Sequence, residues 1–182
     1  MEIRKGFTLI ELLVVIAILA ILATITVVVL NPAELLKQAR DSTRISELAS
    51  LRSAISLYLA SQTSDLTAAT LRCTAGICAG GTSSTITTVA GGGWVNVNFT
   101  LIPGGSPLAA LPLDPVNSAT YFYGYSASST NNLFELNANM ESVRYASGSA
   151  ESVEANTADG GDQSGCYEIG TNVNLITAQC PY

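Results

Sequence analysis

Histidine is missing from this sequence of 182 residues. It is the commonest general base of enzymes, the usual proton switch near neutral pH and a frequent zinc ligand, so each role loses its most common side chain. The Gly-x-Ser-x-Gly pattern of a nucleophile elbow and the Gly-rich phosphate loop are missing too. Carboxylate pairs can also catalyse reactions, but no spacing marks such a pair. We therefore expect a protein that is not an enzyme, against the alternative of a membrane-tethered hydrolase.

Positive charge is scarce. The chain has 8 Lys and Arg against 14 Asp and Glu, which gives a formal net charge of −6. Nucleic-acid phosphates need clustered cations, so this balance argues against a nucleic-acid partner. Most of the cations lie in the first 52 residues, and the full set is Arg4, Lys5, Lys37, Arg40, Arg44, Arg52, Arg72 and Arg144. This asymmetry fits an N-terminus that meets a membrane and an acidic soluble head.

Cysteine is rare but even in number: Cys73, Cys78, Cys166 and Cys180. All four follow the most apolar part of the chain, which suggests disulfides in an oxidising compartment. Four cysteines allow three pairings. The pairing of Cys73 with Cys78 and of Cys166 with Cys180 closes the shortest loops, and we prefer it for that reason.

A long apolar run extends from Phe7 to Leu30, and Glu11 is its only charged residue. As a helix the run is roughly 36 Å long, enough to cross the hydrocarbon core of a membrane. A secretory signal peptide has a shorter run and a small-residue cleavage site behind it. A buried soluble helix is a further alternative, but no polar stripe interrupts the apolar surface. Arg4 and Lys5 would keep the N-terminus in the cytoplasm, so the rest of the chain faces outward.

Glu11 needs an explanation of its own, because a carboxylate within a membrane is costly and usually marks a function or a specific partner. The surrounding string Lys5-Gly6-Phe7-Thr8-Leu9-Ile10-Glu11-Leu12-Leu13-Val14-Val15-Ile16 resembles the class III signal of type IV prepilins and pseudopilins. The resemblance implies that a prepilin peptidase cuts between Gly6 and Phe7 and methylates the new amine of Phe7. It also implies that Glu11 pairs with the N-terminal amine of a neighbouring subunit. A buried charge persists when it is paired, which agrees with that role.

A second helix is expected after the apolar run. Asn31-Pro32 predicts a local break, or a helix that restarts with Pro32 in its first turn. In major pilins of the family the corresponding proline comes earlier, near the place of Val28. From Ala33 to about Gln62, apolar residues recur at helical spacing, as Ile45, Leu48, Leu51, Ile55, Tyr58 and Leu59. We expect this amphipathic helix to pack on a sheet rather than on a membrane surface.

Short strands are expected beyond Ser61. Thr85–Ala90 and Trp94–Thr100 predict a pair joined by three glycines, and Thr120–Ala127 and Leu133–Met140 predict a second pair joined by a polar turn. Tyr167–Ile169 and Asn172–Ile176 are further candidates in the segment that Cys166 and Cys180 bound. The aromatic cluster suits packing on the helix better than stacking on nucleic-acid bases.

Two features of the head invite a comparison with metal sites. Leu111-Pro112-Leu113-Asp114-Pro115, with the aromatic strands that follow, resembles the heads of pseudopilins and small pilins, some of which bind calcium. No matching ligand set is found here. A separate loop holds Glu151, Glu154, Asp159 and Asp162 beside two glycines, but its spacing is not that of an EF-hand. We interpret it as a solvated loop and expect no cofactor.

The sequence thus predicts an α+β, pilin-like fold, in which a long N-terminal helix with a transmembrane and an amphipathic half packs on a small antiparallel sheet. The expected parts are a leader (1–6), an assembly helix (7–30), a stalk helix (31–62) and a β-rich head (63–182) whose C-terminal region is bounded by a disulfide.

The expected function is that of a structural subunit of a type IV pilus or related filament. Before assembly the subunit lies in the cytoplasmic membrane with its head outside, and afterwards in an extracellular or periplasmic homo-oligomer. Prepilin peptidase, a cytoplasmic assembly ATPase and a platform protein are the implied partners. The alternatives are a pseudopilin of a type II secretion or DNA-uptake system and a minor pilin or adhesin with a binding head.

Overall fold

The computed structural model describes residues 6–61, 65–67, 69–75, 78, 81–146, 159–163 and 165–176. The chain divides into two compact units, residues 1–36 and 37–182. Its elements are helices α1 (Leu9–Leu30) and α2 (Pro32–Ser61), a 3-10 turn η1 (Phe99–Leu101), and the strands β1 (Ala69–Cys73), β2 (Thr82–Ser83), β3 (Tyr123–Ser128), β4 (Leu133–Asn139) and β5 (Cys166–Gly170). The long N-terminal helical region and the sheet together make the predicted α+β fold.

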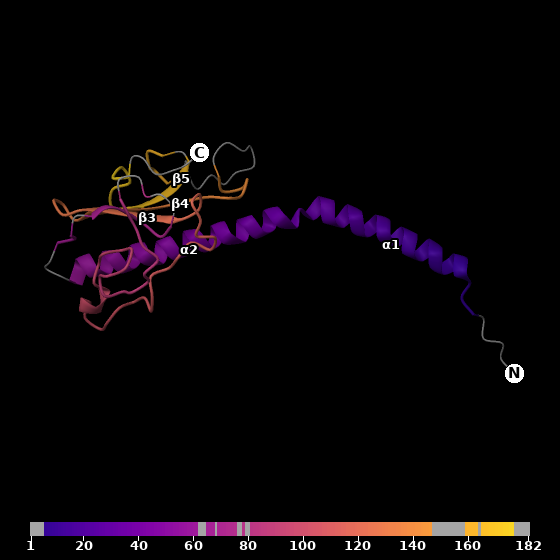
Figure 1. Cartoon of the computed structure of the whole chain (residues 1–182), viewed down its shortest axis with the longest axis horizontal. Helices are drawn as coiled ribbons and strands as arrows, with labels where there is room; N and C mark the ends of the chain where they lie inside the picture. Colours follow the sequence, from indigo (N-terminus) through magenta and orange to yellow (C-terminus); the bar gives the residue numbers. More distant parts are fainter. Residues whose placement is uncertain are drawn as a thin grey trace. The chain divides into compact units, whose positions relative to one another are not determined.

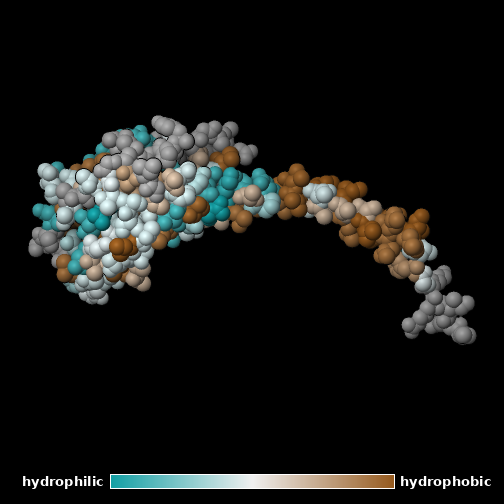
Figure 2. Space-filling view, in the orientation of Figure 1, coloured by the Kyte–Doolittle hydropathy of each residue, from teal (hydrophilic) through white to brown (hydrophobic). Residues whose placement is uncertain are grey.

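Helix α1 is apolar on every side. Its 22 residues are about 33 Å long, which matches the hydrocarbon core of a bilayer. Among the described residues, one helical stretch, beginning at Leu9, is long and apolar enough to cross a membrane by length and composition. The hydroxyls of Thr24 and Thr26 donate to backbone carbonyls three or four residues earlier, at 2.8 to 3.0 Å, so these polar groups are satisfied within the helix. Figure 2 shows the resulting apolar surface in brown.

The predicted break lies at Asn31. This residue ends α1 in the left-handed region, with φ 40° and ψ 68°, which asparagine tolerates better than most residues. Pro32 then opens α2, where its missing N–H leaves no helical hydrogen bond unmade. The Asn31 carbonyl accepts from the amides of Glu34 and Leu35, which starts the second helix. The alternative of a helix that restarts at Pro32 is therefore confirmed.

The sheet has the strand order β2-β1-β3-β4-β5. Strands β1, β3, β4 and β5 pair antiparallel, but β2 pairs parallel to β1 through Arg72 opposite Thr82 and Cys73 opposite Ser83. The predicted all-antiparallel sheet is thus a mixed one. The β3–β4 hairpin agrees with the prediction, and Asn132 takes a positive φ of 53° in its turn.

The core of the second unit lies between α2 and one face of this sheet (Figure 1). Alternate residues of the strands point into it, and the helix contributes residues at spacings of three and four, which are the periods expected for the two kinds of element. The buried set includes Leu48, Leu51, Ile55, Tyr123, Tyr125, Phe134 and Leu136. Each such side chain contributes about 1.5–3 kcal/mol through its removal from water, so this contact holds helix and sheet together.

The predicted strands Thr85–Ala90 and Trp94–Thr100 are wrong, because the region forms only an isolated bridge between Ala90 and Asn98 and the turn η1. Here a side chain, rather than a neighbouring strand, forms hydrogen bonds with the backbone. The Arg72 guanidinium donates to the carbonyls of Gly93 and Trp94, both at 3.0 Å. Four apolar side chains of the segment still enter the core without a strand around them: Trp94, Val95, Val97 and Phe99.

The final predicted strands differ in outcome. Tyr167–Ile169 is confirmed within β5, whereas Asn172–Ile176 is not a strand. The amides of Leu175 and Ile176 donate to the carboxylate of Glu135, at 2.6 and 2.9 Å, and so are not paired with another strand. Strands β1 and β2 were not predicted. Gln62, Glu151, Glu154 and Cys180 lie outside the described residues, so the pairing of Cys166 with Cys180 stays a prediction.

A disulfide joins Cys73 to Cys78, as predicted, and packs with Phe122 in a small cluster of its own. It links the end of β1 to the loop before β2.

Replacement of both cysteines by serine should lower the free energy of unfolding by about 2 kcal/mol, because the bridge restricts a short loop of the unfolded chain. Urea unfolding of the two proteins measures this. The control is wild-type protein in which the Cys73–Cys78 bridge has been reduced and the second predicted disulfide is shown by mass to be intact. It should lose the same stability as the double-serine variant. Equal stability of the oxidised protein, the reduced protein and the variant would contradict the prediction.

Candidate functional site

The start of α1 brings together the residues that the sequence marked for processing and assembly. Thr8 caps the helix: its hydroxyl accepts from the amide of Glu11, at 3.3 Å. Glu11 reaches back, and its Oε2 accepts from the amide and the hydroxyl of Thr8, at 2.8 and 2.7 Å. This reciprocal arrangement is a capping box, which satisfies the first free amides of a helix. Glu11 is therefore held in one orientation within the first turn.

One oxygen of that carboxylate stays available. Both Thr8 donors bind Oε2, and among the described residues none donates to Oε1. Phe7, directly before the cap, is 84% exposed, and Gly6 is exposed as well. An added Cβ at Gly6 meets nothing within 4 Å, so the glycine is not required by packing. The predicted scissile bond, Gly6–Phe7, and the free carboxylate oxygen thus belong to one accessible segment.

The rest of α1 is an apolar surface without a partner inside its own unit. None of its residues is buried, and its large apolar side chains are 47% to 82% exposed. Such a surface in water would bind other apolar surfaces or lipid. The hydrocarbon core of a membrane and the apolar surface of another such helix are both environments of the required kind.

A second cluster, in the head, has a buried cation at its centre. Arg44 of α2 is fully buried and donates from Nε and Nη2 to the two carboxylate oxygens of Asp114, at 2.6 and 2.9 Å. Its Nη1 donates to Asp41 at 2.7 Å, and its Nη2 also lies 2.6 Å from Glu141. The guanidinium lies 5.2 Å from the ring centre of Tyr121. We call Asp41, Arg44, Asp114 and Glu141 the Arg44 network.

The carboxylates of the Arg44 network also organise loop backbone. Asp114 accepts from the amides of Val116 and Asn117, at 2.8 and 3.1 Å. Asp41 accepts from the amides of Glu141 and Ser142, the shortest at 2.8 Å. The network therefore fixes two loops, which follow the Leu111–Pro115 motif and β4, to the helix.

Charge balance decides the protonation of Arg44 and Glu141. Burial would lower the pKa of Arg44, but the hydrogen bonds and charge of Asp114, with those of Glu141 and Asp41, outweigh it and raise the pKa. Burial likewise acts to raise the pKa of Glu141, and Arg40 and Arg44 outweigh it, so that pKa is lowered. A lowered carboxyl pKa means that the contribution of Glu141 to stability is lost as the pH falls through its folded-state value.

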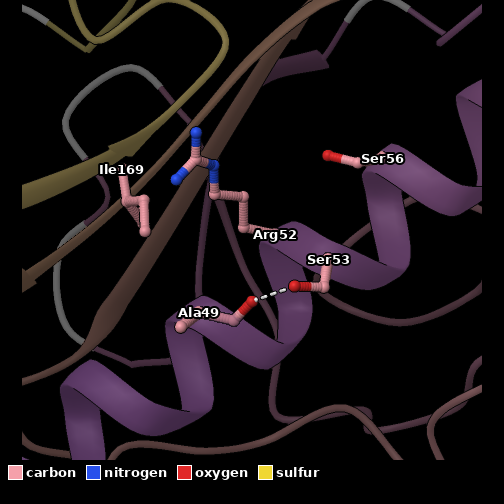
Figure 3. A pocket seen from close by; sticks show the side chains of 5 residues that line it. All are labelled: Ala49, Arg52, Ser53, Ser56 and Ile169. Atoms are coloured by element: carbon pink, nitrogen blue, oxygen red, sulfur yellow. Dashed lines mark hydrogen bonds between the residues drawn. The ribbon is translucent and has the colours of Figure 1, made fainter.

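A shallow depression of about 440 Å³ lies between α2 and β5. Figure 3 shows its lining, in which Arg52 and Ile169 approach from opposite elements and Ser53 donates to the carbonyl of Ala49 at 2.9 Å. The lining contains one cation, hydroxyl groups and apolar carbon. It holds none of the residues that the sequence marked for function.

The predicted acidic loop is only partly described. Asp159 and Asp162 lie before β5, and Asp159 accepts from the amides of Gly161 and Glu168, at 2.9 and 2.6 Å. Within the described ranges, no group of three or more acidic or cysteine side chains is arranged to hold a metal ion. Asp159 thus caps the backbone of β5 and the adjoining turn.

The comparisons with known proteins agree with the site at the start of α1. Neither a curated protein nor a solved structure matches the chain. Residues 2–27 match the family described as the prokaryotic N-terminal methylation motif. The match covers Gly6, Phe7 and Glu11 together with most of α1, so it coincides with the capping box and the apolar surface. The chain therefore carries, at residues 2–27, the N-terminal signal of type IV pilins and prepilins.

Proposed function

We propose that the protein is a structural subunit of a type IV pilus or a related filament, assembled through α1 after its leader is removed. The observation that carries the proposal is the coincidence of the methylation motif with a capping box that leaves one oxygen of Glu11 free. The motif alone supports a type IV pilin-like or pseudopilin-type subunit. The capping box adds a physical reason for the presence of Thr8 and Glu11 at the start of the motif.

Cleavage between Gly6 and Phe7 would create a positive amine one residue before the helix cap. A positive charge at a helix N-terminus is unfavourable, because the aligned peptide dipoles already place partial positive charge there. Glu11 offsets this charge within its own subunit or in a neighbour. In an apolar filament core, pairing the Phe7 amine of one subunit with the free Oε1 of the next would neutralise both charges and set the register between helices.

The implied order of events follows from these properties. The unprocessed chain lies in the membrane through α1, with Arg4 and Lys5 on the cytoplasmic side. The prepilin peptidase removes residues 1–6 and methylates Phe7. A cytoplasmic ATPase and a platform protein then move the subunit into the filament, where copies of α1 cover one another's apolar surface. The head, residues 63–182 of the predicted division, stays outside.

A pseudopilus of a type II secretion or DNA-uptake system uses the same signal and the same helix, and a minor pilin does as well. The number of copies along a filament separates these functions. A major subunit is expected to dominate the protein in sheared surface filaments. A pseudopilin or minor subunit would remain mostly in the cell envelope.

Intact mass and N-terminal sequence test the proposal directly. We expect protein recovered from cell envelopes and sheared filaments to begin at Phe7 and to carry one added methyl group. The variant Gly6→Val should keep its leader, because it replaces the glycine after which the peptidase is implied to cut, whereas an added Cβ at this position meets nothing within 4 Å. A wild-type chain that still begins at Met1 in cells with an active prepilin peptidase would overturn the filament proposal.

A further inference from the structure

Two glutamates lie buried side by side on the face of the sheet that points away from α2. Phe134, Leu136 and Ala138 of β4 enter the core, so Glu135 and Asn137 point to the opposite face. Asn137 pairs across the strands with Glu168 of β5, and Glu135 is its neighbour two residues away. The side chains of Glu135 and Glu168 therefore occupy diagonal positions on one face. Both residues are no more than 1% exposed.

Each of these carboxyl groups uses one oxygen to hold a covering segment. Oε2 of Glu135 accepts from the amides of Leu175 and Ile176, at 2.6 and 2.9 Å. Oε2 of Glu168 accepts from the amide of Gln163, at 3.0 Å. The covering loop is close, since a Cβ on Gly161 would lie 1.7 Å from the same oxygen. In Figure 1 the described C-terminal segments, in yellow, lie toward the side of the sheet away from α2.

The second oxygens have no donor. Among the described residues, no N–H or hydroxyl group donates to Oε1 of Glu135 or of Glu168, although both atoms are buried. The two side chains extend from diagonal positions of neighbouring antiparallel strands on the same face, where long side chains can reach each other. Two ionised carboxylates repel and cannot form a hydrogen bond with each other, whereas a proton on either one supplies it.

Positive charge is missing from the segments packed against the pair. The loop of residues 159–163 brings Asp159 and Asp162, and the segment of residues 171–176 brings no titratable group. On the same face, β3 contributes Gly124, Ser126 and Ser128, which do not titrate. The sequence after Arg144 contains no Lys or Arg at all. A proton is thus the simplest way to compensate the pair.

We propose that Glu135 and Glu168 share one proton and form a pH-sensitive latch that holds residues 159–163 and 171–176 against the outer face of the sheet. With one proton present, the bond between the carboxyl groups joins β4 to β5 and both Oε2 atoms keep their backbone amides. When that proton leaves, two negative charges face each other in a buried site that also contains Asp159. Their repulsion separates the side chains and releases the covering segments from the sheet.

The pH range follows from the direction of the pKa changes. Burial raises the pKa of Glu135, and burial together with the charge of Glu135 raises the pKa of Glu168 to about 8. The ordinary carboxyl pKa is 4.5, so between pH 4.5 and about 8 the folded chain binds more protons than the unfolded chain. The latch is therefore fully closed at low pH and loses its stabilising effect as the pH rises toward about 8.

Hydrogen exchange of the full chain in detergent micelles tests the latch. The protection factors of the Leu175 and Ile176 amides, corrected for the intrinsic exchange rate, are measured at pH 5.5 and at pH 9. We expect at least a tenfold loss of protection at the higher pH, because one unit of pKa displacement corresponds to a factor of ten. The amide of Leu48, in the core helix, should keep its protection and serves as the internal reference.

The variant Glu168→Gln separates a shared proton from simple packing. Its amide has the same shape, accepts from Gln163 and donates permanently to Glu135, so protection of Leu175 and Ile176 should no longer depend on pH. Asp65→Asn removes an equal charge from an exposed site and should behave as wild type. Constant protection in the wild-type chain between pH 5.5 and 9, or an equal loss at Leu48, would overturn the latch, even if Glu168→Gln does not fold.

Discussion

The replacement Glu11→Ala is expected to reduce the amount of filament at least tenfold while the level of processed subunit in the membrane stays the same. The physical reason is the amine that the proposed cleavage would create at Phe7. In the apolar core of a filament, an uncompensated charge costs several kcal/mol, and each 1.4 kcal/mol changes an equilibrium tenfold. Shearing, followed by quantification of subunit in the surface and membrane fractions, measures the effect.

The capping box provides a matched control for this experiment. Glu11→Gln keeps an oxygen that can accept from the amide and hydroxyl of Thr8, so the start of α1 is retained, but it removes the negative charge. We expect this variant to assemble as poorly as Glu11→Ala. Thr8→Ala makes the opposite change, since it removes the capping hydroxyl and leaves the charge, and it should weaken the helix start by only about 1 kcal/mol.

These three variants separate two explanations of the same residue. If Glu11 acts only as part of the helix cap, Glu11→Gln will form filaments at the wild-type level and Thr8→Ala will be impaired. That outcome would contradict the proposed pairing with Phe7 and would leave Glu11 with a local role. Assembly by Thr8→Ala and failure of both Glu11 variants is the result that pairing between subunits predicts.

The parts of the fold that the sequence predicted are those set by local pattern. The apolar run after Phe7 needs no distant partner to be a helix, and Asn31-Pro32 marks its end through backbone restrictions of two adjacent residues. The spacing of Leu48, Leu51 and Ile55 predicted the buried side of α2 in the same way. Strands β3 and β4 were predicted because they are adjacent in the chain and joined by a short polar turn.

The region from residue 84 to 101 shows where local pattern fails. Val95, Val97 and Phe99 alternate with polar residues, which is the signature of a half-buried strand. A strand also needs a neighbour for its backbone, and here the Arg72 side chain occupies the carbonyls of Gly93 and Trp94. The two-residue strand β2 is too short to give any pattern, and its parallel pairing with β1 has no local signal in the sequence.

Distant charges were the other feature that the sequence did not reveal. Arg44 was noted only among the cations of the chain, and Asp114 only as part of a Leu-Pro-rich motif. Their contact joins residues 70 positions apart. The one local signal was Asp41, three residues before Arg44, a spacing that places both side chains on the same side of the helix. Glu135 and Glu168 were missed in the same way, because only the pairing of β4 with β5 brings them together.

Arg44→Met should be the most destabilising single replacement in the head, with a loss of about 3–5 kcal/mol in the free energy of unfolding. Removal of one partner from a buried ion pair leaves the others uncompensated, and here the fully buried Asp41 and Asp114 would both lose their cation. Urea unfolding of the full chain in detergent micelles, followed by the fluorescence of Trp94, measures this. Trp94 is the only tryptophan, and its Nε1 donates to the carbonyl of Pro112, close to Asp114.

Two further variants show whether the loss comes from charge. Arg52→Met changes an exposed arginine of the same helix and should cost less than about 0.5 kcal/mol. Adding Asp114→Asn to Arg44→Met should restore part of the stability, because the neutral amide oxygen still accepts from Val116 and Asn117 while one uncompensated charge disappears. If the double variant is instead less stable than Arg44→Met by the full cost of Asp114→Asn alone, the two residues act independently. The Arg44 network would then stabilise the head through packing rather than through charge.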